Sequence, residues 1–161
     1  MIAKKVLLVG NFGVGKTSLI RQFVLNEFSE DYISTIGVRV STKIVNLNDE
    51  QIKLLIWDVA GTKDDEKVPK AYFLGASAAM YVFDLNREET YLNLKNQLEN
   101  IKQLSGLEDI LVVGNKKDLL TSNEINQVKK IIEIPIDLIT SAKENENVED
   151  AFAILAKQSL K

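Results

Sequence analysis

Eight residues near the N-terminus have the types and the spacing needed to bind a chain of phosphates. Residues 10–17 read Gly-Asn-Phe-Gly-Val-Gly-Lys-Thr and match G-x-x-x-x-G-K-[ST], between an apolar run and a stretch with helical spacing. Glycines let such a loop curl so that successive N–H groups face the phosphates, and the following helix N-terminus adds positive potential. We expect Lys16 to reach the β- and γ-oxygens and the Thr17 hydroxyl to bind Mg²⁺.

A second motif, Asp58-Val59-Ala60-Gly61, follows another apolar run. An Asp after a strand is often only a helix cap, so this motif is weak when it is taken alone. At the end of a neighbouring strand, however, the Asp58 carboxylate can hold Mg²⁺ through water. The Gly61 N–H can approach a γ-phosphate because no Cβ stands in the way.

A third motif, Asn115-Lys116-Lys117-Asp118, points to the base of the ligand. Asp118 can accept two N–H bonds from the edge of guanine, a paired donor edge that adenine lacks, and Asn115 can bridge the loop and the base. Such a tetrapeptide alone is more often a polar turn. Its combination with the phosphate-binding loop favours a guanine nucleotide, and it disfavours an ATPase or kinase. A dinucleotide fingerprint is excluded because residues 16–18 supply no third glycine.

The elements that must position these motifs alternate along the chain. Apolar runs typical of buried strands occupy residues 6–9, 54–57, 78–83, 110–113 and 134–139, and helical spacing lies between several of them. Such alternation predicts a mostly parallel sheet with helices on both faces, whose ligands bind beyond the carboxyl ends of the strands. The motifs follow these runs directly, so we expect them to share one edge of the sheet.

One segment departs from this alternation. Val38, Val40, Thr42 and Ile44 alternate with polar residues, and residues 48–50 turn the chain toward the next apolar run. This pattern predicts a hairpin that ends in an antiparallel edge strand.

Composition limits the classes of function that remain. The 161 residues suit one domain, and 45% hydrophobic with 27% charged residues is typical of a folded protein. A net charge of -3 argues against a nucleic-acid partner, and the lack of Cys and His removes thiol, imidazole and most zinc chemistry. No stretch approaches a membrane span, so we expect a cytoplasmic protein. No Cys is present for lipidation, which leaves membrane association open.

With its motifs in this order, the chain resembles the Ras-like small GTPases, and most closely their Rab branch, over nearly its whole length. The segments that carry the resemblance are residues 10–18, 32–38, 57–61, 115–118 and 141–143. The resemblance implies an α/β P-loop NTPase fold in a single domain, residues 1–161, with a mostly parallel six-stranded sheet, one antiparallel edge strand and helices on both faces. It also implies a switch that binds GTP or GDP with Mg²⁺ and hydrolyses GTP.

The resemblance further implies roles for single residues. Thr35 binds Mg²⁺ and senses the γ-phosphate, Tyr32 closes over the phosphates, Phe28 and Lys116 flank the guanine ring, and the Ala142 N–H contacts the guanine carbonyl. Without the resemblance, Phe28 reads more simply as a core contact. The predicted nucleotide-binding set is Asn11, Phe12, Gly13, Val14, Gly15, Lys16, Thr17, Ser18, Phe28, Tyr32, Thr35, Gly61, Asn115, Lys116, Asp118, Ser141, Ala142 and Lys143. The predicted metal ligands are Thr17, Thr35 and Asp58, and the predicted catalytic residues are Lys16, Thr35, Gly61 and Thr62.

Two segments, residues 31–38 and 61–72, correspond to the switches of that family, through which effectors, an exchange factor and a GTPase-activating protein are expected to bind. Two residues depart from the family pattern. Thr62 stands where Gln usually orients the attacking water, and Phe12 stands where a small residue is common. They leave two hypotheses open: a switch that hydrolyses GTP slowly, or a scaffold that stays loaded with GTP because its hydrolysis is impaired.

Overall fold

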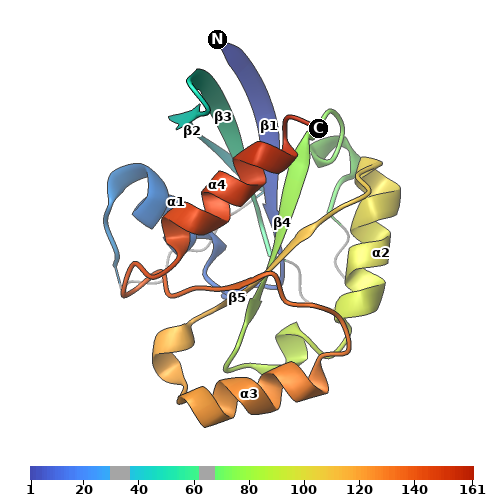
Figure 1. Ribbon diagram of the computed structural model, residues 1–161. Coiled ribbons are helices and arrows are strands. Elements are labelled where there is room, and N and C mark those ends of the chain that lie inside the picture. The colour runs from blue at the N-terminus through green and yellow to red at the C-terminus, as the bar shows by residue number, and fades with distance from the viewer. Residues whose placement is uncertain (30–36, 62–67) are drawn as a thin grey trace.

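The computed structural model describes residues 1–29, 37–61 and 68–161, and Figure 1 shows a central sheet with helices packed around it. Within these residues the sheet has six strands in the order β2-β3-β1-β4-β5-β6. Their bounds are β1 Ile2–Val9, β2 Val38–Leu47, β3 Glu50–Val59, β4 Ala78–Asp84, β5 Leu111–Asn115 and β6 Leu138–Ile139. Only β2 pairs antiparallel, with β3, and every other pairing is parallel. The predicted fold class is confirmed.

The hairpin of β2 and β3 turns at the predicted position. Asn48 and Asp49 have φ of 49° and 68°, the left-handed conformation that two-residue hairpin turns require. Asn and Asp tolerate this conformation better than most residues do. The turn sets the register in which Val40 faces Trp57 and Ile44 faces Lys53, with β2 at the edge of the sheet.

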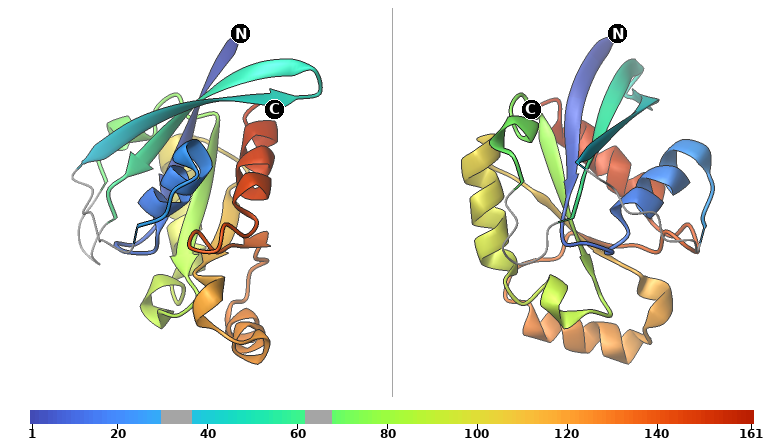
Figure 2. Two further views of the ribbon diagram at one scale, coloured as in Figure 1. Left: turned by 90° about the vertical axis from the view of Figure 1, so that its left-hand side faces the viewer. Right: turned by 180° about the vertical axis from the view of Figure 1, so that it is seen from behind.

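Helices cover both faces of the sheet. The described helices are α1 Lys16–Leu25, α2 Leu94–Ser105, α3 Ser122–Ile131 and α4 Val148–Gln158, with short 3₁₀ turns η1 Lys70–Tyr72, η2 Glu88–Thr90 and η3 Lys117–Leu119. One core cluster joins α1 and α4 to the sheet, and a second joins α2 and α3 to its other face. Accordingly, α4 lies in front of the sheet in Figure 1 and behind it in the right-hand view of Figure 2.

The chain between residues 121 and 139 differs from the sequence-based expectation. Helix α3 was not anticipated, although Thr121 and Glu124 form a capping box at its start. The predicted strand 134–139 is wrong over its first four residues, because only Leu138 and Ile139 join the sheet. Pro135 has no N–H to give a ladder, and Ile134 and Ile136 pack against the core from an irregular segment.

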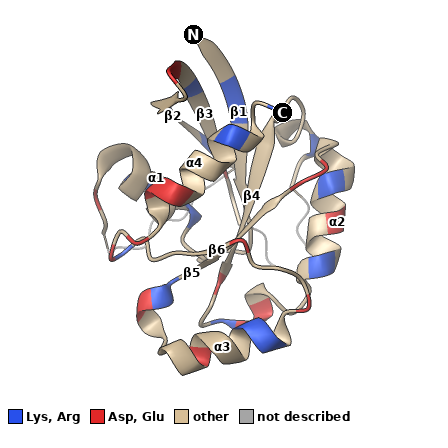
Figure 3. Cartoon of the chain, viewed as in Figure 1, with Lys and Arg blue, Asp and Glu red and all other residues tan. Residues whose placement is uncertain are grey.

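The surface charges are mixed on the helices farthest from the hairpin. Along α2, Glu99 lies between Lys95 and Lys102, whereas α3 has Glu124 in its first turn and Lys129 and Lys130 in its last turn, so both helices carry charges of both signs (Figure 3). In the described part of the chain, no helix has the length and apolar character required to cross a bilayer.

Candidate nucleotide-binding site

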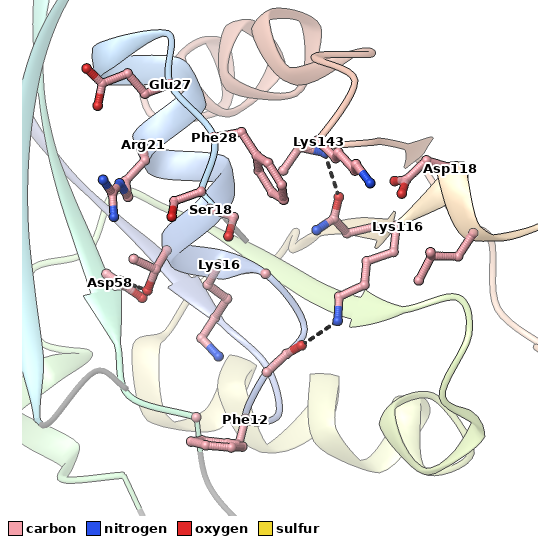
Figure 4. A pocket seen from close by; sticks show the side chains of 18 residues that line it. Phe12, Lys16, Ser18, Arg21, Glu27, Phe28, Asp58, Lys116, Asp118 and Lys143 are labelled. Atoms are coloured by element: carbon pink, nitrogen blue, oxygen red, sulfur yellow. Dashed lines mark hydrogen bonds between the residues drawn. The ribbon is translucent and has the colours of Figure 1, made fainter. Parts of the chain in front are cut away.

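A pocket of about 320 Å³ lies at the carboxyl ends of β1, β3 and β5 (Figure 4). This is the edge of the sheet where the sequence motifs were expected to meet, and the volume is in the range of small-molecule sites. The lining residues are Phe12, Gly13, Gly15, Lys16, Thr17, Ser18, Arg21, Glu27, Phe28, Ser29, Asp58, Gly61, Asn115, Lys116, Asp118, Leu119, Ala142 and Lys143. Four separate segments of sequence therefore build one cavity.

The phosphate-binding loop, residues 10–17, has each of its carbonyls from Gly10 to Gly15 tied by a donor. A loop whose carbonyls are drawn away in this manner turns its N–H groups to the other side, which makes an anion-binding nest. The bonds are Lys16 Nζ to Gly10 O (2.9 Å) and Asn11 O (3.0 Å), Arg87 Nη1 to Phe12 O (2.9 Å), Lys116 Nζ to Gly13 O (2.8 Å), Asn115 Nδ2 to Val14 O (3.0 Å) and Leu19 N to Gly15 O (2.9 Å).

Gly15 shows why this loop needs glycine just before the helix. Its φ is 102°, and a Cβ at this position would lie 2.3 Å from Asn115 Nδ2, the group that binds the Val14 carbonyl. Any side chain would be strained and would push the base-recognition motif away from the loop. Gly15 therefore lets the phosphate-binding and base-binding motifs touch.

The predicted metal ligands that the structure describes lie side by side. Thr17 Oγ1 donates to Asp58 Oδ2 at 2.5 Å, and Asp58 is only 2% exposed. These are hard oxygen donors, and Mg²⁺ in phosphate sites takes only one or two protein groups together with phosphate oxygens and waters. The two residues therefore fit Mg²⁺. The described ranges contain no group of three or more His, Cys, Asp or Glu residues that could hold a metal ion, and a Mg²⁺ site with phosphate does not require one.

Lys16 has the electrostatics of a phosphate ligand. Burial lowers the pKa of its ammonium to about 8, and the nearby Asp58 carboxylate partly offsets this by raising it. A buried cation of this kind gains strongly from an anionic partner. Lys16 therefore supplies attraction for phosphate at the floor of the pocket.

At the far end of the loop, Gly61 packs directly on Phe12. A Cβ on Gly61 would lie 2.4 Å from both the N and the Cα of Phe12, so no side chain fits here. Phe12 itself is 36% exposed and lies on the opposite side of the pocket from Asp118 (Figure 4). Three predicted site residues at this end, Tyr32, Thr35 and Thr62, lie outside the described residues.

The base-recognition side chains hold one another. Ser141 Oγ donates to Asp118 Oδ1 at 2.7 Å, while Asn115 Oδ1 accepts from Thr140 Oγ1 at 3.0 Å and from the Ala142 N–H at 3.2 Å. The structure thus directs the Ala142 N–H, predicted to contact guanine, toward Asn115. These bonds fix both Asn115 and Asp118 in place.

Aromatic and aliphatic side chains form the walls beside this motif. Phe28 projects into the same pocket as Lys116 and Asp118, from a separate segment of the chain (Figure 4). Phe28 is 37% exposed and belongs to neither core cluster, so the alternative of a core contact does not hold. Lys116 has a left-handed backbone, φ 70°, which aims its side chain back at the phosphate-binding loop.

Most of the described residues of the predicted site line the pocket, and three lie behind its wall: Asn11, Val14 and Ser141. Sequence reasoning missed the lining residues Arg21, Glu27, Ser29 and Leu119, and it missed Arg87 and Thr140 as supports. It also missed Gln22, which is 7% exposed and donates to Ala142 O at 2.8 Å. The sequence feature that could have identified Gln22 is a polar residue beside the apolar stripe of α1.

Comparison with known proteins gives consistent matches over the whole site. The family model described as "Ras family" matches residues 5–161. Ras-related protein Rab-4A of Homo sapiens is 38% identical over 162 residues, covering 97% of this chain and 74% of that protein. Ras-related protein Rab-8B of Homo sapiens is 36% identical over 158 residues, covering 95% and 76%. Ras-related protein SEC4 of Saccharomyces cerevisiae is 35% identical over 158 residues, covering 95% and 73%.

Proposed function

Since the chain belongs to the Ras family and to its Rab branch, we propose that it is a guanine-nucleotide switch that binds GTP or GDP with Mg²⁺ and hydrolyses GTP slowly. Family membership gives the broad function, that of a small GTPase. The base, the metal and the slow rate are inferred from this chain's own residues.

The observation that carries the proposal is the convergence of three chemistries in one pocket. The nest of the phosphate-binding loop takes the phosphates, Thr17 and Asp58 take the metal, and Asp118 takes the base. Guanine is favoured over adenine because a carboxylate at the base end can accept both the ring N–H and the amino group of guanine. Ser141 supports this role, since its hydroxyl donates to one Asp118 oxygen and holds the carboxylate in place.

The residues of the site perform binding and charge stabilisation rather than covalent chemistry. Lys16 would neutralise the β- and γ-phosphates, and the Gly61 N–H would bind the γ-phosphate. Thr17, Asp58 and Thr35 would hold Mg²⁺, which would supply further neutralisation of the phosphates. Positioning of the attacking water falls to Thr62, whose side chain is shorter than Gln, and hydrolysis is therefore slow.

Two described contacts support a switch that partners can sense. The Ala60 N–H donates to Gly37 O at 2.8 Å, which joins the ends of the two predicted switch segments. The ring of Trp57 on β3 lies near that of Tyr72, the last residue of the second predicted switch segment, with ring centroids 6.5 Å apart. A γ-phosphate bound by Gly61 would pull on both segments through this joint, and effectors, an exchange factor and a GTPase-activating protein would respond to the change.

A second function, a scaffold that stays loaded with GTP, is favoured by one specific observation. The Phe12 backbone packs against Gly61, and Phe12 lines the end of the pocket where the γ-phosphate would bind. A ring in this position would hinder both the attacking water and an arginine supplied by a partner. Together with Thr62, this would leave nucleotide binding intact and remove turnover.

The nucleotide that co-purifies with the protein tests both functions. One sample of purified protein is denatured, and the released nucleotide is identified by chromatography. In a second, native sample, GDP, ADP and their triphosphates compete for the nucleotide site. Guanine nucleotide with a preference of about 1,000-fold or more over adenine supports the switch. GTP alone, stable for days, would favour the scaffold, and equal affinity for ADP and GDP would overturn both.

A further inference from the structure

We propose that Arg87 is a positioning residue that holds the phosphate-binding loop closed around the nucleotide, an inference that rests on the proposed nucleotide-binding function. Its Nη1 donates to Phe12 O at 2.9 Å across 75 positions of sequence. Arg87 belongs to none of the four motifs that define the site, and it does not line the pocket. It acts on the loop from the outer side.

Among the described carbonyls from Gly10 to Gly15, that of Phe12 accepts its hydrogen bond from a residue outside the motifs and outside the helix that follows the loop. Among the bonds described from Gly10 to Gly15, the other donors are Lys16, Asn115, Lys116 and the first turn of α1. Arg87 supplies the donor for Phe12, the most exposed residue of this stretch. It also lies close to Gly13, since a Cβ added to Gly13 would lie 3.0 Å from Arg87 Nη1. The guanidinium thus packs directly against the loop.

The backbone of Arg87 is rigidly placed. Thr90 is 2% exposed, and its hydroxyl has Arg87 O (2.7 Å) and Asp84 O (3.0 Å) as acceptors for its one proton, while it accepts from the Asp84 N–H (2.9 Å). The Arg87 N–H donates to Asp84 O at 3.1 Å. This compact turn after β4 fixes the direction in which the Arg87 side chain leaves the chain.

Carboxylates on two sides orient the guanidinium. Arg87 Nε donates to Glu89 Oε1 at 3.0 Å, and Arg87 Nη1 lies 4.0 Å from Asp84 Oδ2. A backbone hydrogen bond and the Arg87 side chain lower the pKa of Glu89, which is consistent with a favourable interaction between its carboxylate and the guanidinium. A guanidinium held on two sides has little freedom to leave the Phe12 carbonyl.

Asp84 joins this contact to the base-recognition motif. Its carboxylate is 1% exposed and lies 2.9 Å from Lys116 Nζ, which in turn donates to Gly13 O. Two cations around one buried carboxylate therefore hold two consecutive carbonyls of the loop. If the Arg87 contact is lost, the Phe12 carbonyl can rotate, and the N–H groups beside it lose their alignment with the phosphates.

The test compares the release of GDP with that of GMP, because the loop grips the β-phosphate that GMP lacks. Arg87→Ala is expected to speed the release of a fluorescent GDP analogue about tenfold, the loss typical of one charge-assisted hydrogen bond, and to reduce the preference for GDP over GMP by a similar factor. Arg87→Lys keeps a single donor, as Lys116 does for Gly13, and is expected to restore most of the preference.

Lys95→Ala, which removes an exposed cation from α2, serves as the control and should leave both rates unchanged. Glu89→Gln should speed GDP release about twofold in the parent and have no effect in Arg87→Ala, because the two residues act as a unit. Arg87→Ala that leaves GDP release within twofold of the parent, or that weakens GDP and GMP alike, overturns the inference alone. A parent that does not prefer GDP to ADP overturns the proposed function and the inference with it.

Discussion

The base end and the phosphate end of the pocket are built on different principles. At the base end, side chains do the work: Asp118, Asn115, Ser141 and Thr140 hold one another by hydrogen bonds. At the phosphate end, the N–H groups of the loop backbone form the anion-binding nest. Side chains from distant segments hold the loop carbonyls, as Arg87 holds that of Phe12. Specificity for the base therefore rests on single side chains, whereas affinity for phosphate is distributed over a whole loop.

This difference also separates binding from hydrolysis. Of the two residues that depart from the family pattern, Phe12 lies at the phosphate end, and Thr62, outside the described residues, directly follows Gly61 in the sequence. A loop that binds through its N–H groups tolerates a change of side chain, so Phe12 can affect the reaction without removing the nest. The base end is expected to have no such tolerance, because the proposed role of Asp118 depends on both oxygens of its carboxylate.

The largest effect is expected from Asp118→Asn. Ser141 will continue to donate to the amide oxygen of the new residue, which leaves its NH₂ group toward the base. That group opposes the guanine donors and can instead donate to the extra carbonyl of xanthine. Affinity for GDP should fall about 1,000-fold while affinity for xanthosine diphosphate rises, as measured by competition at equilibrium.

Asp109→Asn, at an exposed position, is the matched control and should bind GDP like the parent. A variant of Asp118 that kept its preference for GDP would show that the base end does not depend on this side chain.

The next effect concerns the metal ligands at the phosphate end. Thr17→Ala is expected to speed the Mg²⁺-dependent release of both GDP and GTP about 100-fold, because it removes a ligand present in both states. Thr35→Ala should harm mainly the GTP-bound form, in which alone Thr35 reaches the metal. Release rates with Mg²⁺ and with a chelator separate the two. Equal loss of GDP in both variants contradicts the role of Thr35, and Thr42→Ala on β2 is the control.

A smaller effect is expected from restoring the hydrolytic residues. Thr62→Gln should raise the single-turnover rate of GTP hydrolysis about tenfold, because a longer amide can hold water in line with the γ-phosphorus. If the Phe12 ring blocks that water, only the double variant with Phe12→Gly will respond, a non-additive result expected of neighbouring groups. A parent that already matches the double variant removes the reason for the scaffold hypothesis.

The smallest effect tests the support behind the base end. Thr140→Val keeps the shape of a buried side chain but removes the hydroxyl that donates to Asn115 Oδ1. GDP release should quicken about fivefold, the cost of one lost neutral hydrogen bond, while the rate of hydrolysis stays the same. An unchanged release rate would show that the Ala142 N–H and the bond from Asn115 Nδ2 to Val14 O suffice to fix Asn115.

The parts of the molecule that depend on local sequence were predictable. Apolar runs located four of the six described strands closely, and the turn at Asn48 and Asp49 located the hairpin. The motifs fixed the pocket because each follows a strand directly, and parallel strands bring their carboxyl ends together. Helix α3 was missed although the capping box at Thr121 is a local signal, so this failure was avoidable.

The supports of the site were not predictable in this way. Arg87 and Gln22 act on groups 75 and 120 positions away, and neither carries a sequence pattern that identifies its partner. The error at residues 134–139 has a similar cause, since an apolar run shows that a segment is buried but not whether it joins a ladder. Pro135 was the one residue that argued against a strand there.

The strand order has a consequence for how the chain is made. β1 lies inside the sheet, where Ile2 pairs with Ile52 and Val6 pairs with Ala78, so the ribosome releases this apolar strand well before either neighbour. The nascent chain must keep β1 from other contacts until β4 emerges, which makes assembly late and non-local. The pocket is complete only once Ser141 and Ala142 have left the exit tunnel. Nucleotide binding can therefore stabilise the finished fold, but it cannot assist the early steps of folding.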